Sequence, residues 1–120
     1  MHKLKRFSKK NRILASHDFR EIRKQGQRVR HYPFYIYARN ENSLDSRIGI
    51  VISKKQIRFA VKRNRVRRHI KEWFRLHREE LPFCDMVVIV TAGANELNSD
   101  ELRRCLDKLR QKLISRCNAA

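Results

Sequence analysis

The residues of this sequence that are best suited to chemistry are arginines and lysines concentrated in one segment. Residues 54–78 carry eleven basic side chains and one acid, Glu72. Arginine binds phosphate oxygens through two parallel, charge-assisted hydrogen bonds, a geometry that lysine does not reproduce. The tripeptide Arg63-Asn64-Arg65 lies near the middle of this segment. The segment therefore predicts contact with a polyanion, and nucleic acid is the leading candidate.

The apolar residues of the same segment predict how these charges are presented. A helix over about residues 59–80 would place Val66, Ile70, Trp73 and His77 on one stripe, and Pro82 disfavours its continuation. Phe59 and Phe74 would lie at the edges of this stripe. Like charges four residues apart destabilise an isolated helix, which favours a bound polyanion over a face that meets only water. The side of the helix opposite the stripe carries Asn64, Arg67, Arg68, Lys71, Arg75 and Arg78.

A second candidate surface follows from the alternation of side chains along residues 34–39. Phe34, Ile36 and Ala38 would point toward the core of a sheet, and the intervening residues toward its other face. Aromatic rings beside arginines on a sheet can stack on unpaired bases. A first helix that carries Phe19 and Ile22 could cover this face, and we expect it to form one wall of a groove. The predicted outer face consists of Tyr35, Tyr37, Arg39, Arg47, Gly49 and Val51.

Catalytic groups are poorly represented in the sequence. The three glycines are too far apart for a phosphate-binding loop. The histidines are scattered, and Asp85 is the single acid in a confidently predicted strand, whereas a two-metal nuclease needs several convergent carboxylates. We therefore expect no catalytic residue and no metal site in the protein itself.

Composition sets the class of protein. The chain has 120 residues, a net charge of +18 and a hydrophobic content of 41%, which suit one small domain with a polyanionic partner. The longest uncharged stretch has ten residues, about half of the ~20 needed to span a bilayer. Three cysteines without a C-x-x-C pair suit reduced thiols, and no secretory signal is recognisable. We expect a cytoplasmic protein without a membrane partner.

The order of predicted elements is helix, two or three strands, helix, strand, helix, which is a small α+β domain with one sheet packed by helices. Residues 1–14 are predicted to form a basic N-terminal arm, and residues 15–117 a single RNA-binding domain. Asn98 is expected to cap the last helix together with Glu101. The core stripe of that helix would be Leu102, Cys105, Leu106, Leu109 and Leu113.

The chain resembles the protein component of bacterial ribonuclease P. The resemblance is carried by Arg47-Ile48-Gly49-Ile50, by Ser53-Lys54-Lys55 and by the run from Ala60 to Arg68 that contains Arg-Asn-Arg. It extends to the first helix, the strand at residues 34–37 and the final strand and helix. The resemblance implies an αβββαβα sandwich of the ribosomal protein S5 domain 2-like kind, with a left-handed crossover between the parallel strands.

The same resemblance implies a function. Members of this family assist endonucleolytic removal of the 5′ leader from precursor tRNA, while catalysis belongs to an RNA subunit with bound Mg²⁺. The implied partners are ribonuclease P RNA and precursor tRNA, and no DNA is expected. Residues implied to bind the catalytic RNA are Arg63, Asn64, Arg65, Arg67, Arg68, Lys71 and Arg75. Residues implied to bind the leader are Phe19, Arg23, Tyr35, Tyr37, Arg47, Lys54 and Lys55.

Two other classes of protein agree with the composition. A ribosomal or ribosome-assembly protein could carry the same amphipathic basic helix, although the setting of Arg-Asn-Arg disfavours it. A DNA-binding regulator could use residues 59–80 as a recognition helix. A strand, rather than a tight helix-turn-helix, is predicted before that segment, which disfavours this alternative.

Overall fold

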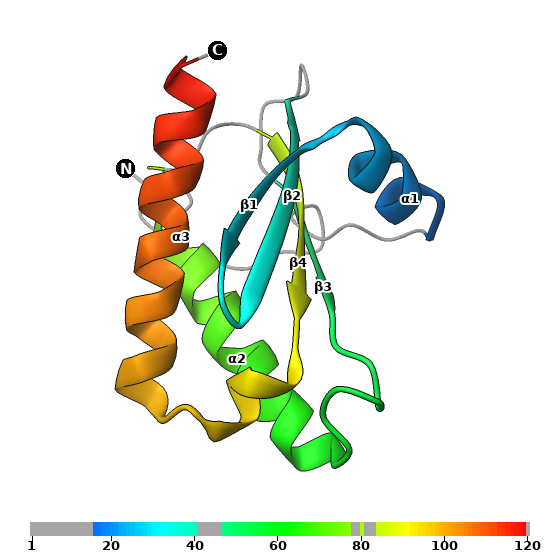
Figure 1. The fold of residues 1–120 in the computed structure, drawn as a ribbon, viewed down its shortest axis with the longest axis vertical. Helices are drawn as coiled ribbons and strands as arrows, with labels where there is room; N and C mark the ends of the chain where they lie inside the picture. Colours follow the sequence, from blue (N-terminus) through cyan, green and yellow to red (C-terminus); the bar gives the residue numbers. More distant parts are fainter. Residues whose placement is uncertain (1–15, 41–46, 78–79, 81–83, 120) are drawn as a thin grey trace.

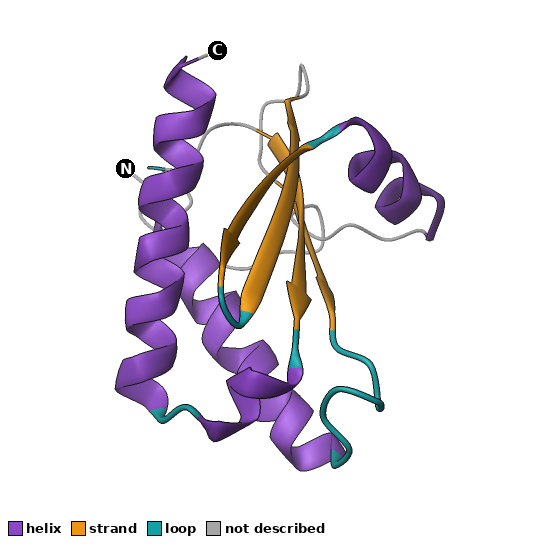
Figure 2. Cartoon of the chain, in the orientation of Figure 1, coloured by secondary structure: helices purple, strands orange, loops and turns teal. Residues whose placement is uncertain are grey.

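A computed structural model describes residues 16–40, 47–77, 80 and 84–119 of the chain, and within them the predicted order of elements is confirmed. Three helices flank a set of four strands (Figures 1 and 2). The elements are α1 (Ser16–Gln25), β1 (Gln27–His31), β2 (Phe34–Asn40), β3 (Arg47–Val51), α2 (Ala60–His77), β4 (Cys84–Val90), the short 3₁₀ helix η2 (Ala92–Glu96) and α3 (Ser99–Ala119). The predicted arm, residues 1–14, lies outside the described residues.

The four strands form one mixed sheet in the order β1-β2-β4-β3. β2 pairs antiparallel with β1 and β4, whereas β3 and β4 are parallel neighbours joined through α2. β4 is an interior strand and is buried on both faces at Met86, Val87 and Val88, as its continuous apolar sequence predicts. The left-handed course of the crossover through α2 stays a prediction from the resemblance.

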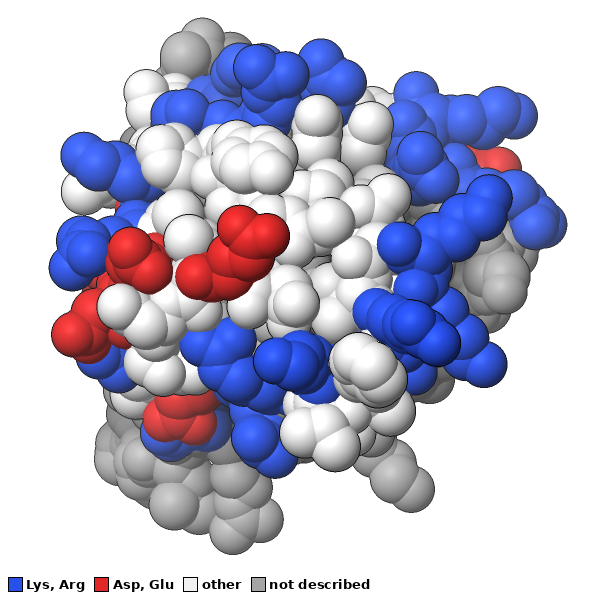
Figure 3. Space-filling view, turned by 60° about the horizontal axis from the view of Figure 1, so that its bottom comes forward, with Lys and Arg blue, Asp and Glu red and all other residues white. Residues whose placement is uncertain are grey.

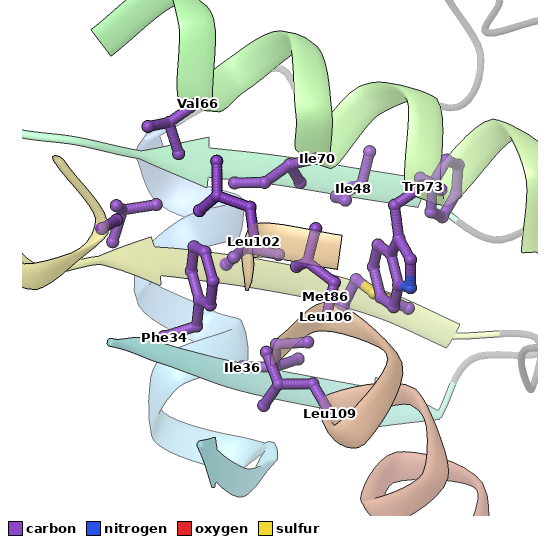
Figure 4. Close-up of a cluster of buried hydrophobic side chains, with 14 of the residues drawn as sticks. Phe34, Ile36, Ile48, Val66, Ile70, Trp73, Met86, Leu102, Leu106 and Leu109 are labelled. Carbon is purple, nitrogen blue, oxygen red and sulfur yellow. The ribbon is translucent and has the colours of Figure 1, made fainter. Parts of the chain in front are cut away.

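The main core lies between the sheet and the pair α2 and α3 (Figure 4). Alternate strand residues such as Phe34 and Ile36 meet the apolar stripes of both helices there, and each fully buried side chain of this size contributes roughly 1.5–3 kcal/mol. All the apolar positions predicted for α3 are buried except Cys105, which is partly buried. On α2 the buried residues are Val66, Ile70, Trp73 and Phe74.

Two predictions about α2 were wrong. Phe59 is not at the edge of the core but 58% exposed, because the helix begins one residue later, at Ala60. Phe74 is fully buried rather than peripheral, while His77 is partly exposed at the end of the helix. The core stripe is therefore centred closer to Ile70 than the sequence pattern suggested. Arg78 lies outside the described residues.

The first turn of α3 is capped as predicted. The backbone N–H of Glu101 donates to Asn98 Oδ1 at 2.8 Å, and the N–H of Asn98 donates to Glu101 Oε1 at 2.9 Å. This reciprocal pair satisfies two backbone donors that a helix start otherwise leaves unpaired. The cap fixes where α3 begins, directly after η2.

Helix α1 packs on the other face of the sheet (Figure 1). Its Ile22 is fully buried against Val87 of β4, and Phe19 and Tyr37 pack around this pair. Gly26 ends the helix, although it does not have a positive φ. A side chain is excluded there because a Cβ atom would lie 2.6 Å from the carbonyl oxygen of Ile22 and 2.7 Å from that of Ala38.

Candidate nucleic-acid interface

The exposed face of α2 carries the predicted phosphate-binding residues. Asn64 and Arg68 are exposed, and Arg67, Lys71 and Arg75 are half-buried along the side of the helix. Arg67 Nη1 donates to Asn64 Oδ1 at 3.2 Å, so the asparagine orients a neighbouring guanidinium group. The rigid backbone of α2, held by its four buried residues, sets the spacing of these groups.

Two of the predicted phosphate-binding arginines, Arg63 and Arg65, donate hydrogen bonds to backbone carbonyl oxygens. Arg63 Nη1 donates to the carbonyl oxygens of Ile57 at 3.0 Å and Arg58 at 2.9 Å, which closes the loop before α2. Arg65 Nη2 donates to the carbonyl oxygen of Leu97, between η2 and α3. Arginine has five N–H donors, so these bonds leave others for phosphate. The Arg-Asn-Arg segment therefore shapes the surface and can also bind a ligand.

The charge of α2 is partly balanced toward its C-terminal end. Arg75 forms an ion pair and hydrogen bonds with Glu72 one turn earlier. This hydrogen bond lowers the pKa of Glu72 and raises the pKa of Arg75. The strongest positive field on α2 is thus expected over its N-terminal half, around Arg67 and Arg68.

The predicted aromatic surface is present on the face of the sheet that α1 partly covers. Tyr35 and Tyr37 are half-buried, and the guanidinium carbon of Arg23 lies 5.5 Å from the centre of the Tyr37 ring. Phe19 and Tyr37 both pack against the Ile22–Val87 pair, so α1 and the sheet meet close to these rings. Gly49, which was predicted to lie on this outer face, is buried and is not part of the exposed surface.

An ion-pair cluster closes one end of this face. Arg47 donates to both carboxylate oxygens of Asp85, at 2.8 and 2.6 Å, and Arg39 donates to one of them at 3.2 Å. Burial by itself would raise the pKa of Asp85, but the hydrogen bonds from Arg47 and Arg39 lower it. Arg47, which the resemblance places in leader binding, thus has its guanidinium group held by a buried carboxylate.

Lys54 and Lys55 are exposed in the loop that leaves β3. The carbonyl oxygen of Ser53 accepts hydrogen bonds from the N–H groups of Gln56 and Ile57, both at 3.1 Å, and Ile57 is buried. This anchored turn presents both lysines to solvent. They lie in the loop that joins β3, a strand of the sheet with the aromatic surface, to α2. The other residues predicted to bind RNA lie on that face of the sheet, on α1 or on α2.

Sequence analysis missed two arginines beside the aromatic surface. The guanidinium carbons of Arg28 and Arg30 lie 5.6 and 5.9 Å from the centre of the Tyr35 ring. Their register opposite Tyr37 and Tyr35 puts them on the same face, a placement that strand alternation from Arg28 onward could have revealed. In Figure 3 lysine and arginine side chains gather around the rim of one face, and its middle is mostly uncharged apart from acidic side chains toward the left.

The described residues do not fit a protein-held metal ion. They include no group of three or more His, Cys, Asp or Glu residues that could hold one. The carboxylate of Asp85 is matched by two arginines, an arrangement that opposes a bound cation.

None of the helices in residues 16–40, 47–77 and 84–119 is long and apolar enough to cross a bilayer.

Comparisons with known proteins agree with this surface. The sequence model of the Ribonuclease P family matches residues 7–114. The ribonuclease P protein component of Coxiella burnetii is 41% identical over 105 residues, covering 88% of this chain and 87% of that protein. The corresponding protein of Aliivibrio fischeri is 37% identical over 107 residues and covers 89% and 92%.

Solved structures agree as well. The RNase P protein of Staphylococcus aureus has a TM-score of 0.77 and 32% identity, covering 82% of this chain and 91% of that one. The RNase P protein of Thermotoga maritima has a TM-score of 0.75 and 27% identity, covering 84% and 96%. These matches confirm the predicted fold class and decide against the ribosomal and DNA-binding alternatives. The family model matches residues 7–114 and the curated relatives cover nearly nine-tenths of the sequence, so the chain belongs to the ribonuclease P protein family.

Proposed function

We propose that this protein binds ribonuclease P RNA through α2 and the 5′ leader of precursor tRNA through the groove between α1 and the sheet. In this proposal it acts in the cytoplasm by positioning two RNAs, and the RNA subunit carries out the endonucleolytic cleavage. Membership of the family supports the partnership with ribonuclease P RNA. The precursor, the groove and the division of labour are inferred from the surfaces described above.

The observation that carries the leader proposal is the pairing of cations with half-buried rings on the face of the sheet beside α1. Tyr37 and Phe19 pack against the same buried pair, Arg23 lies over the Tyr37 ring, and Tyr35 is two residues from Tyr37 on β2. Unpaired bases can stack on aromatic rings, while guanidinium groups bind the phosphates between them. Only a precursor presents such a strand, so this contact would distinguish precursor tRNA from mature tRNA.

The resemblance implies that Arg23 of α1 binds the leader. Because its guanidinium group already lies over the Tyr37 ring, we propose that it contacts a phosphate or sugar of the leader instead of stacking on a base. Lys54 and Lys55 would bridge the groove to the RNA that α2 binds. Arg47 would contribute mainly by ordering this end of the sheet through Asp85.

The Mg²⁺ that the resemblance implies is proposed to be held mainly by RNA. The protein would assist by lowering the repulsion between RNA phosphates, for which α2 and the groove supply arginines and lysines. No protein side chain is assigned to a catalytic step.

A cleavage assay at low Mg²⁺ tests the division of labour. It compares this protein alone, bacterial ribonuclease P RNA alone and both together on a precursor tRNA. We expect rapid removal of the leader with both components present. Cleavage by the protein alone would overturn the proposal, and so would the absence of any stimulation of an RNA shown to be active at high Mg²⁺.

The groove is tested by replacing its rings. Phe19→Ala with Tyr37→Ala should weaken holoenzyme binding to precursor tRNA by about tenfold or more, since each stacked base contributes about 1–3 kcal/mol. Binding of mature tRNA should be unchanged. Tyr37→Phe keeps the ring and serves as the control, and circular dichroism checks that each variant is folded. Equal losses for precursor and mature tRNA would contradict leader binding in this groove.

A further inference from the structure

A second basic groove lies between the edge strand β1 and the C-terminal half of α3. It encloses a volume of about 650 Å³. Four of its lining residues are positively charged, and no described residue that lines it is acidic. The two walls are about eighty residues apart in sequence, so only the fold brings their charges together. The lining residues are Arg28, Val29, Arg30, Gln111, Lys112, Ser115 and Arg116.

Hydrogen bonds to the edge strand hold the cationic groups of α3 in place. Lys112 Nζ donates to the carbonyl oxygen of Arg30 at 2.7 Å, and Arg116 Nη1 donates to that of Arg28 at 3.3 Å. An ammonium group has three donors and a guanidinium group five, so both keep donors for a further acceptor. The bonds therefore fix two positive charges along the edge of the sheet.

The groove has an excess of positive charge, which a bound anion would neutralise. His31 lies at its border, with Nδ1 3.5 Å from Lys112 Nζ. Burial lowers the pKa of His31 first, and the charges of Lys112 and Lys108 lower it further. The two lysines therefore oppose protonation of His31, in the same direction as burial does.

The groove is continuous with the aromatic surface. Arg28 and Arg30, which form its sheet-side wall, are the same residues whose guanidinium groups lie 5.6 and 5.9 Å from the Tyr35 ring. A strand that crosses the sheet at Tyr37 and Tyr35 meets these two arginines next, and then Lys112 and Arg116. Its described lining residues include cations and no aromatic side chain, which suits a phosphate backbone rather than stacked bases.

We propose that the groove between β1 and α3 binds the phosphate backbone of the distal part of the leader, beyond the nucleotides held at the tyrosines. This inference rests on the proposed leader-binding function and extends it. It makes affinity depend on leader length: a short leader reaches only the tyrosines, whereas a long leader also reaches Lys112 and Arg116. The contact is independent of base sequence, because the groove presents charges and hydrogen-bond donors to phosphates.

The test uses the reconstituted holoenzyme and precursors whose leaders are lengthened one nucleotide at a time. The variant Lys112→Gln with Arg116→Gln removes two charges and keeps polar side chains. The matched control, Arg103→Gln with Arg104→Gln, removes two charges from other parts of the same helix. Dissociation constants are measured for each precursor, for mature tRNA and for ribonuclease P RNA alone, and unfolding curves verify that both variants are folded.

We expect the Lys112 and Arg116 variant to lose affinity for long leaders and to bind short leaders like the wild type. A single strand contributes a salt slope of about 0.7 per neutralised phosphate, so two lost contacts should lower the slope by about 1.4. When the salt concentration rises from about 50 to about 200 mM, the affinity of the wild type for long leaders should therefore fall about sevenfold more than that of the variant. The control should show no dependence on leader length.

Each other outcome overturns the proposal in a distinct way. Equal losses in the test and control variants would mean that the effect is general electrostatics. Weaker binding of ribonuclease P RNA alone, at every leader length, would assign the groove to that RNA instead. A wild type that binds short-leader precursor, long-leader precursor and mature tRNA equally would refute leader binding as a whole, including the proposed function. If short-leader precursors bind more tightly than mature tRNA but longer leaders add no further affinity, only the proposed binding in the groove between β1 and α3 is refuted.

Discussion

The two faces of the sheet are made from the same strands but bury very different amounts of apolar surface. Nineteen buried residues form the core under α2 and α3, whereas Ile22 and Val87 are the two buried residues of the cluster under α1. The α1 face instead carries tyrosines, arginines and the Asp85 ion pairs. The difference teaches that one face supplies stability, which leaves the other free to carry polar groups that a ligand needs.

The largest expected effect comes from the core face. Phe74→Ala should lower the free energy of unfolding by about 3–5 kcal/mol, because a fully buried ring is replaced by a cavity. Ile22→Ala on the α1 face should cost about 2 kcal/mol and mainly loosen α1, which few buried contacts hold. Denaturant unfolding measures the totals, and amide hydrogen exchange shows which helix opens. Equal global losses from both variants would show that the faces form one cooperative unit.

A smaller effect is expected from the ion pairs on the α1 face, and it depends on pH. The arginines hold the pKa of Asp85 below its ordinary value of about 4 in spite of burial, so the carboxylate contributes its full stability above that pH. This contribution is lost as the pH falls through the lowered pKa. Asp85→Asn should cost about 1.5–3 kcal/mol at neutral pH, since hydrogen bonds to a buried charge are lost.

The difference between wild type and Asp85→Asn should therefore shrink as acid is added below about pH 4. Urea unfolding of both proteins from neutral to acidic pH measures this directly. A difference that stays constant over the whole range would mean that the carboxylate charge does not stabilise this face.

The smallest effect separates two arginines of α2 that the sequence presents as equivalent. Arg63→Ala should lower stability by about 1 kcal/mol, because the carbonyl oxygens of Ile57 and Arg58 lose their donor. Arg68→Ala, at an exposed position, should change stability by less than about 0.5 kcal/mol. Both should weaken binding to ribonuclease P RNA. Thermal unfolding and RNA titration of the same samples would contradict this distinction if the two variants lost equal stability.

Local patterns predicted most of the fold because the physics behind them is local. Alternation along residues 34–39, the apolar stripe of α3 and the Asn98–Glu101 cap each depend on neighbours within a few residues, and the structure confirms all three. The predicted position of Phe59 was wrong because α2 begins at Ala60. A shift of one residue at a helix start can turn a side chain from the core to the solvent.

The sequence by itself determined the class of partner and the helix that carries the Arg-Asn-Arg segment, since a net charge of +18 and a dense basic segment are properties of composition and order. Tertiary structure alone decided which charges are held by the protein and which remain available. It tied Arg63 and Arg65 to backbone carbonyls, matched Asp85 with Arg47, and brought Arg28 and Arg30 to Lys112 and Arg116. Electrostatic and hydrogen-bonding partners are set by distance in space, and residues far apart in the chain become neighbours only when the sheet and α3 pack together.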